Sequence, residues 1–301
     1  MYGDDGKLNT NPTDQANIFN KYFASVFTVD NGVSPPVKSS QKGQLNDVSF
    51  TPGKICNVLE KLKTKFSSGP DGVPSVFFKQ LADVLCWPLS FVFDASFKAG
   101  VLPACWLDAI VTPVFKKGAT SKPENYRPIS LTCICCRIME RVINHDMLDF
   151  LRSKGIITQA QHGFLRKHST SSNLLESLRD WSIALNRRQS VDVIYIDFRK
   201  AFDSVSHPKL IIKLVSAGIS GNLLNWIKAF LTNRTQSVKV ADSLSNKIMV
   251  TSGVPQGSVL GPTLFVIFIN DIADILIDLN VTMKLFADDV KMYSVVDLGI
   301  S

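Results

Sequence analysis

Two neighbouring aspartates, Asp288 and Asp289, interrupt a mostly apolar segment near the C-terminal end of the sequence. The flanking residues 283–286 and 290–293 favour β-strands, in which successive side chains point to opposite faces. A pair of adjacent charges is tolerated in such a segment mainly at the tip of a hairpin, where the turn exposes both carboxylates. The sequence therefore predicts a β-hairpin whose tip is suited to binding a divalent cation.

A third aspartate, Asp197, ends another strand-like run, residues 191–196. Between this run and the hairpin lies a glycine- and proline-rich segment, residues 251–262, whose glycines allow a ligand to approach the backbone closely. An isolated Asp-Asp pair is usually a solvated turn. Three acids at strand ends would repel one another without a counter-charge, so we expect Asp197, Asp288 and Asp289 to share one cation site.

The overall charge favours an acidic partner. The 301 residues carry a formal net charge of +7, and the sequence pI is about 9.1. This balance favours binding to a polyanion such as nucleic acid, although it can also simply aid solubility. The length allows a large core in one or two domains.

The apolar segments do not predict a secreted or membrane protein. Residues 1–7 are polar and do not resemble a signal peptide. The longest apolar stretch, residues 259–269, contains Gly261 and Pro262 and is shorter than the roughly 20 residues that span a bilayer. We expect this stretch to be a buried helix, and we expect an intracellular protein without membrane contacts.

The six cysteines do not form a metal-binding pattern. Cys133 and Cys136 have Cys-x-x-Cys spacing, but neither a second pair nor a suitably spaced histidine completes a zinc site. Their neighbours are apolar at helical spacing, which favours packing. We expect all six cysteines to be reduced and structural.

The chain divides into four predicted parts. Residues 1–27 contain an amphipathic helix after Pro12, which we expect to pack on its own protein, with docking to a partner as the alternative. Residues 28–50 are a predicted linker, followed by parts at 51–190 and 191–301. Further predicted elements are helical segments within 51–107 broken at 69–72 and at Pro88, helices at 136–151, 169–185, 207–215 and 221–231, a strand at 111–115, and a hairpin of 237–240 with 247–251. This mixture indicates an α+β fold.

Six short segments, in order, resemble motifs of one family. YIDFRKAFD at residues 195–203, GVPQGSVLGP at 253–262 and FADD at 286–289 are similar to motifs A, B and C of a reverse transcriptase palm. Upstream, SGPDGVP at 68–74, NYRPISL at 125–131 and QHGF at 161–164 resemble the fingers motifs of non-LTR (LINE-type) retrotransposon enzymes. The resemblance covers residues 51–294. It implies a right-hand polymerase fold with fingers at 51–190 and a partial palm at 191–301, and we expect the thumb to be missing.

The resemblance also implies a reaction and a metal centre. It implies an RNA-directed DNA polymerase that adds dNTPs to a primer 3′-hydroxyl with two Mg²⁺ ions, for which Mn²⁺ can substitute. Asp197 and Asp288 are expected to bridge the ions, with Asp289 assisting and the carbonyl oxygen of Phe198 as a further ligand. All four residues provide the oxygen ligands that Mg²⁺ prefers.

Two further residues, Phe202 and Gln256, are candidates for contacts near the nucleotide. The resemblance places Phe202 beneath the incoming sugar, where its ring would exclude a 2′-hydroxyl; core packing is the alternative. Gln256 has an amide that can contact the nucleotide or the template, and an exposed loop glutamine is the alternative. Asp203 stays outside the catalytic set, because it can either cap a helix beginning at Ser204 or hold the loop by hydrogen bonds.

Basic residues are expected to bind phosphates. Lys116, Arg127 and Arg166 are candidates for the triphosphate, and the resemblance supports Arg127 most directly. Lys116 and Arg166 can equally contact the template. The candidates for nonspecific phosphate contacts are Lys63, Lys117, Lys122 and Lys167.

The expected partners are an RNA template, a DNA primer and dNTPs, and the resemblance implies a nuclear location. Two alternatives remain. The first is a catalytically silent nucleic-acid-binding fragment of a retroelement, against which the intact Asp197, Asp288 and Asp289 argue. The second is an RNA-dependent RNA polymerase, which fits Phe202 and the FADD turn less well and which nucleotide preference would distinguish.

Overall fold

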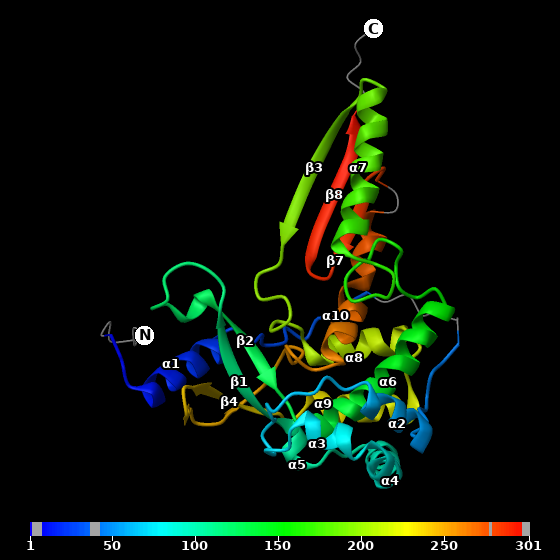
Figure 1. The fold of residues 1–301 in the computed structure, drawn as a ribbon. Helices are drawn as coiled ribbons and strands as arrows, with labels where there is room; N and C mark the ends of the chain where they lie inside the picture. Colours follow the sequence, from blue (N-terminus) through cyan, green and yellow to red (C-terminus); the bar gives the residue numbers. More distant parts are fainter. Residues whose placement is uncertain (2–7, 37–42, 277–278, 297–301) are drawn as a thin grey trace.

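Two separate β-sheets organise the protein in a computed structural model that describes residues 1, 8–36, 43–276 and 279–296 (Figure 1). The first sheet has the strand order β2-β1-β4-β5, and β6 also pairs with β4. The second sheet has the order β3-β8-β7. Strand bounds are β1 Asp108–Phe115, β2 Tyr126–Leu131, β3 Ser190–Asp197, β4 Thr235–Val240, β5 Ser243–Leu244, β6 Ile248–Met249, β7 Thr282–Phe286 and β8 Asp289–Val296.

The helices lie mostly below the second sheet, where they form the main core (Figure 1). Their bounds are α1 Pro12–Ser25, α2 Pro52–Glu60, α3 Ser75–Gln80, α4 Ala82–Ala99, α5 Ala104–Leu107, α6 Ile134–Ser153, α7 Thr170–Asn186, α8 His207–Ser216, α9 Gly221–Leu231 and α10 Gly261–Ile269, with 3₁₀ segments η1 Pro123–Asn125 and η2 Asn270–Leu276. Fully buried aromatic rings such as Phe93, Trp226 and Phe230 fill this core. The predicted α+β class is confirmed.

Polar residues at the helix starts explain several boundaries. Thr51 accepts a hydrogen bond from the backbone N–H of Lys54 and begins α2, and Ser206 does the same with Lys209 at α8. Ser169 and Ser172 form a capping box at the start of α7. These contacts satisfy N–H groups that have no acceptor within the helix.

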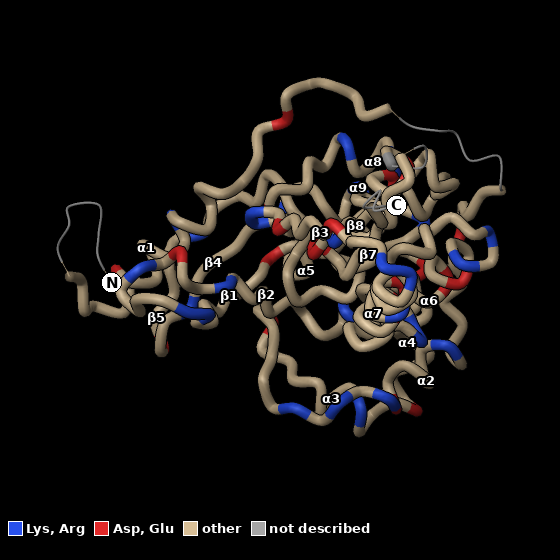
Figure 2. The backbone as a smooth tube through the Cα atoms, turned by 90° about the horizontal axis from the view of Figure 1, so that it is seen from above, with Lys and Arg blue, Asp and Glu red and all other residues tan. Residues whose placement is uncertain are grey.

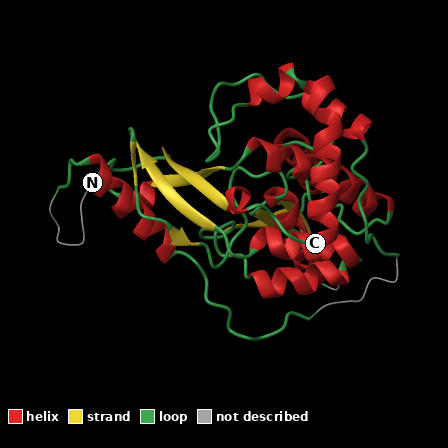
Figure 3. Cartoon of the chain, turned by 90° about the horizontal axis from the view of Figure 1, so that it is seen from below, coloured by secondary structure: helices red, strands yellow, loops and turns green. Residues whose placement is uncertain are grey.

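The predicted amphipathic helix is α1, and it packs on its own protein. Phe19 and Phe23 are buried against Val111 of β1 and Val238 of β4. The phenyl ring of Phe19 meets that of Tyr126 edge-on, with ring centroids 4.8 Å apart. Helix α1 therefore covers one face of the first sheet (Figure 3).

The predicted helix break at Pro88 is wrong, because α4 continues through this residue. A proline inside a helix removes one backbone hydrogen bond and costs about 3 kcal/mol or more. Leu89, Phe93 and Phe97 lie on the buried face of the same helix and anchor it in the core. Burial of these side chains, at roughly 1.5–3 kcal/mol each, exceeds the cost of the proline.

The sheet pairing connects distant parts of the chain. The predicted pairing of 237–240 with 247–251 is wrong in register, because Lys239 and Val240 pair with β5, whereas β6 pairs with the start of β4, with Thr235 opposite Met249. In addition, β4 pairs in parallel with β1, with Asp108 opposite Thr235. Strands from both sides of residue 190 thus form one sheet, and the boundary between 51–190 and 191–301 stays a prediction.

The cysteines only partly follow the packing prediction. All six are free thiols. Cys133 and Cys136 are buried in the main core, and burial raises the pKa of both thiols, so both stay protonated. Cys105, in contrast, is exposed. In the described part of the chain, every helix is too short or too polar to traverse a bilayer.

Candidate active site

The predicted carboxylate hairpin is present. Strands β7 and β8 pair antiparallel, and the two-residue turn between them consists of Ala287 and Asp288. Asp197, the last residue of β3, lies opposite Asp289, the first residue of β8. The three aspartates therefore lie at the same, lower end of the second sheet (Figure 1), but within the described residues their carboxylate oxygens do not all come within 4.8 Å of one another.

The electrostatics of this cluster fit a divalent cation. Partial burial raises the pKa of Asp288, and repulsion by the carboxylates of Asp289 and Asp197 raises it further. The positive charge of Lys116 acts in the opposite direction and lowers this pKa. Oxygen ligands with unrelieved mutual repulsion suit a hard ion such as Mg²⁺. The carbonyl of Phe198 stays a predicted ligand.

A segment far upstream holds the turn in place. The side-chain carbonyl oxygen of Gln161 accepts hydrogen bonds from the backbone N–H groups of Ala287, at 2.9 Å, and Gly163, at 2.7 Å. The backbone N–H of His162 donates to Leu285 at 2.8 Å. Gln161 is 1% exposed, so these bonds are shielded from water. The QHGF segment thus supports the turn that carries Asp288. The sequence did not predict this supporting role of Gln161.

Gly163→Ala is expected to disrupt this support. A Cβ atom at position 163 would lie 2.3 Å from the backbone nitrogen of Ala287, so the hairpin would have to move. Overpacking of this kind costs about 1–3 kcal/mol, and a shift of about 1 Å at a catalytic group can lower a rate about a hundredfold. Chemical denaturation and primer extension would measure the two effects.

Gly53→Ala is the matched control for Gly163→Ala. Gly53 lies in the first turn of α2, and within the described residues no atom outside its chain neighbours and the backbone of its own helix lies within 4 Å of the added Cβ. Alanine in a helix is roughly 0.5–1 kcal/mol more stable than glycine. Wild-type stability and extension in Gly163→Ala would contradict the proposed role of the QHGF segment.

Phe202 packs beside the glycine-rich loop. Its ring stacks on that of Phe265 in α10, with centroids 4.4 Å apart and planes at 13°. Phe164, from the QHGF segment, meets the same ring edge-on at 6.0 Å. The side chain of Phe202 is only partly buried, so packing does not cover it completely.

Gln256 and Asp203 are bonded to each other. The side-chain amino group of Gln256 donates to Asp203 Oδ1 at 2.8 Å. The helix predicted to begin at Ser204 in fact begins at His207, with Ser206 as its cap, so the capping role of Asp203 is wrong. Asp203 instead holds the loop, and Gln256 is half-buried, which contradicts the alternative of an exposed loop glutamine.

A buried glutamate supports the start of α10. Glu140, in α6, is 0% exposed and accepts hydrogen bonds from the backbone N–H groups of Val259, at 2.7 Å, and Leu260, at 2.9 Å. Burial raises the pKa of Glu140, while these bonds and the charges of Arg234 and Arg137 oppose that rise. The sequence signal that could have identified Glu140 is a single acidic residue on the otherwise apolar face of the predicted helix 136–151.

The basic candidates come from several segments of the chain. Lys116 directly follows β1 and is exposed, and its charge lowers the pKa of Asp288. Arg127 is exposed on β2, opposite Val114 of β1. The remaining candidates are all exposed: Lys63 between α2 and α3, Lys117, Lys122 paired with Glu124 at 3.6 Å, and Arg166 and Lys167 after the QHGF segment. The stretch before α3 shows several basic segments (Figure 2).

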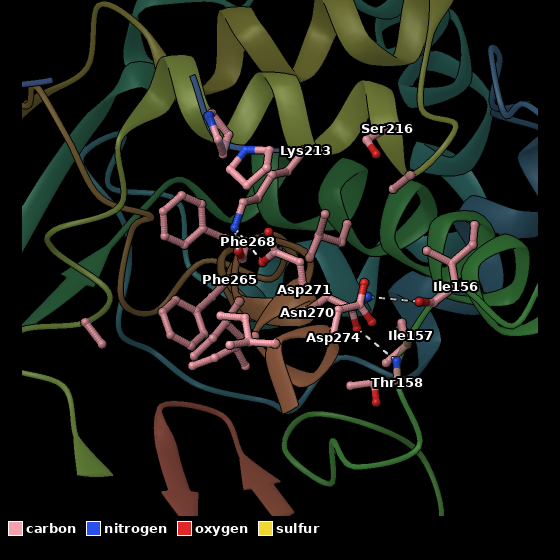
Figure 4. A pocket seen from close by; sticks show the side chains of 18 of the residues that line it. Ile156, Ile157, Thr158, Lys213, Ser216, Phe265, Phe268, Asn270, Asp271 and Asp274 are labelled. Carbon is pink, nitrogen blue, oxygen red and sulfur yellow. Dashed lines mark hydrogen bonds and ion pairs between the residues drawn. The ribbon is translucent and has the colours of Figure 1, made fainter. Parts of the chain in front are cut away.

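A cavity of about 1250 Å³ lies beside the candidate site, between α8, η2 and residues 155–159 (Figure 4). Lys213 Nζ binds Asp271 Oδ1 at 2.6 Å, and Asn270 bonds to the backbone of Ile156 and Thr158, each at 2.9 Å. Phe198 lines this cavity, but Asp197, Asp288 and Asp289 are not among the described residues that do so. The cavity is therefore separate from the carboxylate cluster.

Comparison with known proteins agrees with this geometry. The family model described as "Reverse transcriptase (RNA-dependent DNA polymerase)" matches residues 114–296, which include the three aspartates and the glycine-rich loop. The chain is 28% identical over 276 residues to the probable RNA-directed DNA polymerase from transposon BS of Drosophila melanogaster, covering 89% of this chain and 30% of that protein.

Two other relatives belong to related elements. The chain is 31% identical over 219 residues to the RNA-directed DNA polymerase from mobile element jockey of Drosophila melanogaster, covering 72% of this chain and 24% of that protein. It is 32% identical over 169 residues to the retrovirus-related Pol polyprotein from type-1 retrotransposable element R2 of Popillia japonica, covering 55% and 23%. The chain spans less than a third of each relative. It belongs to the reverse transcriptase (RNA-dependent DNA polymerase) family, as a domain of the non-LTR (LINE-type) retrotransposon kind.

Proposed function

We propose that this chain is the core of an RNA-directed DNA polymerase that adds dNTPs to a primer 3′-hydroxyl on an RNA template. The location of Asp197, Asp288 and Asp289 at one end of the same sheet, in a chain of this family, carries the proposal. We assign residues 51–190 to the fingers and 191–301 to part of the palm. A nuclear location follows from the family in the same way and is part of the proposal.

The three aspartates would hold two Mg²⁺ ions, or Mn²⁺ in their place. When bound, such ions stabilise negative charge on the attacking and leaving oxygens of phosphoryl transfer. Asp197 and Asp288 would be the main ligands, and Asp289, which lies opposite Asp197 on the neighbouring strand, would assist them. The QHGF segment fixes the turn that presents Asp288, so this carboxylate is oriented before substrate binds.

Basic residues would neutralise the triphosphate and the template. The positive charge of Lys116 lowers the pKa of Asp288, and we assign this side chain to a phosphate beside the aspartates. Arg127, on the strand next to Lys116, is exposed and free of any ion pair within the described residues. Arg166 completes the proposed triphosphate set, and Lys63, Lys117, Lys122 and Lys167 would contact backbone phosphates without reading sequence.

The decisive experiment is primer extension by the purified chain on an RNA template with dNTPs and Mg²⁺. Extension that requires all three components would support the proposal. RNA binding without extension, under conditions in which the protein is folded, would favour the catalytically silent alternative. Preference for NTPs over dNTPs would favour an RNA-dependent RNA polymerase.

Phe202→Val is expected to weaken the selection of deoxynucleotides. The smaller side chain leaves room for a 2′-hydroxyl, so ribonucleotide use relative to deoxynucleotide use should rise about tenfold or more. Loss of stacking on Phe265 should cost about 1–3 kcal/mol of unfolding free energy. Competitive extension with dNTPs and NTPs would measure the selectivity.

Phe93→Leu is the control for lost stability in that experiment. Phe93 is fully buried in α4, in the main core, so its substitution lowers stability without touching Phe202. Sugar selectivity should change in Phe202→Val and stay constant in Phe93→Leu. If the preference for dNTPs over NTPs were equal in the two variants, Phe202 would not be the residue that excludes the 2′-hydroxyl.

A further inference from the structure

The loop that carries Gln256 is fixed on two sides. The backbone carbonyl of Gln256 accepts a hydrogen bond from the N–H of Ser130 in β2, at 2.7 Å. The following residue, Gly257, has a φ of +118°, and a Cβ atom there would lie 2.4 Å from the carbonyl oxygen of Ser130. The main chain at 256 and 257 therefore lies directly against β2.

The same loop is also bound to the segment around Phe202 and Asp203. The backbone N–H of Val254 donates to Phe202 at 2.9 Å, and Ser252 Oγ donates to the backbone carbonyl of Asp203 at 2.7 Å. A Cβ atom on Gly253 would lie 2.9 Å from the backbone of Asp203. The side chain of Asp203 is thus held close to the loop, and it directs Oδ1 at the amide of Gln256.

The chemistry of the two side chains decides how the amide is oriented. An ionised carboxylate accepts hydrogen bonds and donates none, so only the amino group of Gln256 can face it. Burial raises the pKa of Asp203, but the bond from Gln256 and the positive charge of Lys200 both favour the ionised form. With the amino group committed to Asp203, the carbonyl oxygen of Gln256 is left to accept a hydrogen bond from another group.

We propose that Asp203 is a positioning residue that orients the carboxamide of Gln256, so that its carbonyl oxygen accepts a hydrogen bond from the incoming nucleotide. This inference rests on the proposed polymerase function. Asp203 makes no contact with substrate and acts only through Gln256. Phe202 directly precedes Asp203, and the backbone carbonyls of both accept hydrogen bonds from this same loop.

The test compares Asp203→Ala with the parent in steady-state extension. Loss of a charge-assisted hydrogen bond frees the amide, and the KM for dNTPs is expected to rise about tenfold. The kcat is expected to stay within about twofold, because the lost interaction contributes equally to substrate and transition-state binding. Asp203→Asn, which keeps an acceptor, should show a smaller rise.

Repeating the Asp203→Ala substitution in a Gln256→Met protein distinguishes orientation of the Gln256 amide from a general effect on the loop. In Gln256→Met, which has no amide, adding Asp203→Ala should leave the KM unchanged, because Asp203 then has nothing to orient. Ser252→Ala is the control, since it removes the hydrogen bonds of Ser252 Oγ to the backbone carbonyl of Asp203 and from the N–H of Thr28, and leaves the bond between Gln256 and Asp203 in place. Additive effects of Asp203→Ala and Gln256→Met, or a rise in KM for Ser252→Ala equal to that of Asp203→Ala, would overturn the proposal.

A readout without catalysis keeps this inference separate from the proposed function. Failure of the parent to extend primers would reject the polymerase function alone. The side-chain amide protons of Gln256, identified by their loss from the NMR spectrum of Gln256→Met, should exchange with water about tenfold more slowly in the parent than in Asp203→Ala. Equal exchange in the two proteins would overturn the orientation by Asp203.

Discussion

Asp197→Asn or Asp288→Asn is expected to lower the rate of primer extension about a thousandfold. Asparagine keeps the size of the side chain but removes the negative charge that binds a divalent ion. Metal ions contribute several kcal/mol to the stabilisation of transition-state charge, and each 1.36 kcal/mol corresponds to a tenfold change in rate. Single-turnover extension on an RNA template with saturating dNTP would measure the loss.

Asp192→Asn provides the matched control for this pair. Asp192 lies on the same strand, β3, and is exposed like Asp197, but it pairs with Ser294 at a distance from the turn. Its substitution should leave the rate within about twofold. Extension by Asp288→Asn at the parental rate would show that the carboxylate cluster is not the metal site.

Asp288→Asn should also change how stability depends on pH. Burial and the neighbouring carboxylates raise the pKa of Asp288 in the folded state above its ordinary value of 3.8. At pH values between the ordinary pKa and the raised pKa of the folded state, the folded protein binds more protons than the unfolded chain. The contribution of Asp288 to the free energy of unfolding therefore falls as the pH rises through this window. Above the window the folded protein carries the full electrostatic penalty of the ionised group.

Without metal at neutral pH, Asp288→Asn should therefore melt at a higher temperature than the parent. The difference should disappear below the ordinary pKa of aspartate, where both proteins carry a neutral side chain at 288. Adding Mg²⁺ should raise the melting temperature of the parent and not that of the variant. A variant less stable than the metal-free parent at neutral pH would contradict the repulsion within the cluster.

Glu140→Leu is expected to lower the free energy of unfolding by about 3–5 kcal/mol. The substitution leaves the backbone N–H groups of Val259 and Leu260 without their acceptor in a buried site. It also removes the negative charge near Arg234, which is 2% exposed. Urea denaturation followed by circular dichroism would measure the loss.

Glu124→Leu is the control for removing a glutamate at the surface. Glu124 forms an exposed ion pair with Lys122, and such pairs contribute about 0–1 kcal/mol. A loss below about 1 kcal/mol in Glu140→Leu would show that Glu140 does not support the start of α10. Because Gln256 precedes this helix by a few residues, the same variant should also weaken nucleotide binding.

Local patterns in the sequence predicted the elements that carry the candidate site. The strand ending at Asp197, the hairpin with Asp288 in its turn and the helix after the glycine-rich loop are all present, because strand alternation, turn residues and helical spacing act over a few residues. The resemblance to reverse transcriptase motifs added the relation between these elements, which local patterns do not contain.

The contacts that hold the site together could not be predicted in this way. Gln161 reaches Ala287, and Glu140 reaches Leu260, across more than a hundred residues of sequence. Each is a single polar side chain whose partner is a backbone group, so no complementary residue in the sequence marks the pair. The helix through Pro88 was missed for a related reason, because burial of its face in the tertiary structure outweighed the local preference.

The parallel pairing of β1 with β4 has a consequence for the synthesis of this protein. Asp108 and Thr235 are 127 residues apart, and at roughly 5–20 residues per second a ribosome needs about ten seconds to make the chain between them. During that time the β1–β2 hairpin leaves the ribosome with one edge of β1 unpaired. An open edge of this kind can pair with another nascent chain, so aggregation during translation should depend on how quickly β4 arrives.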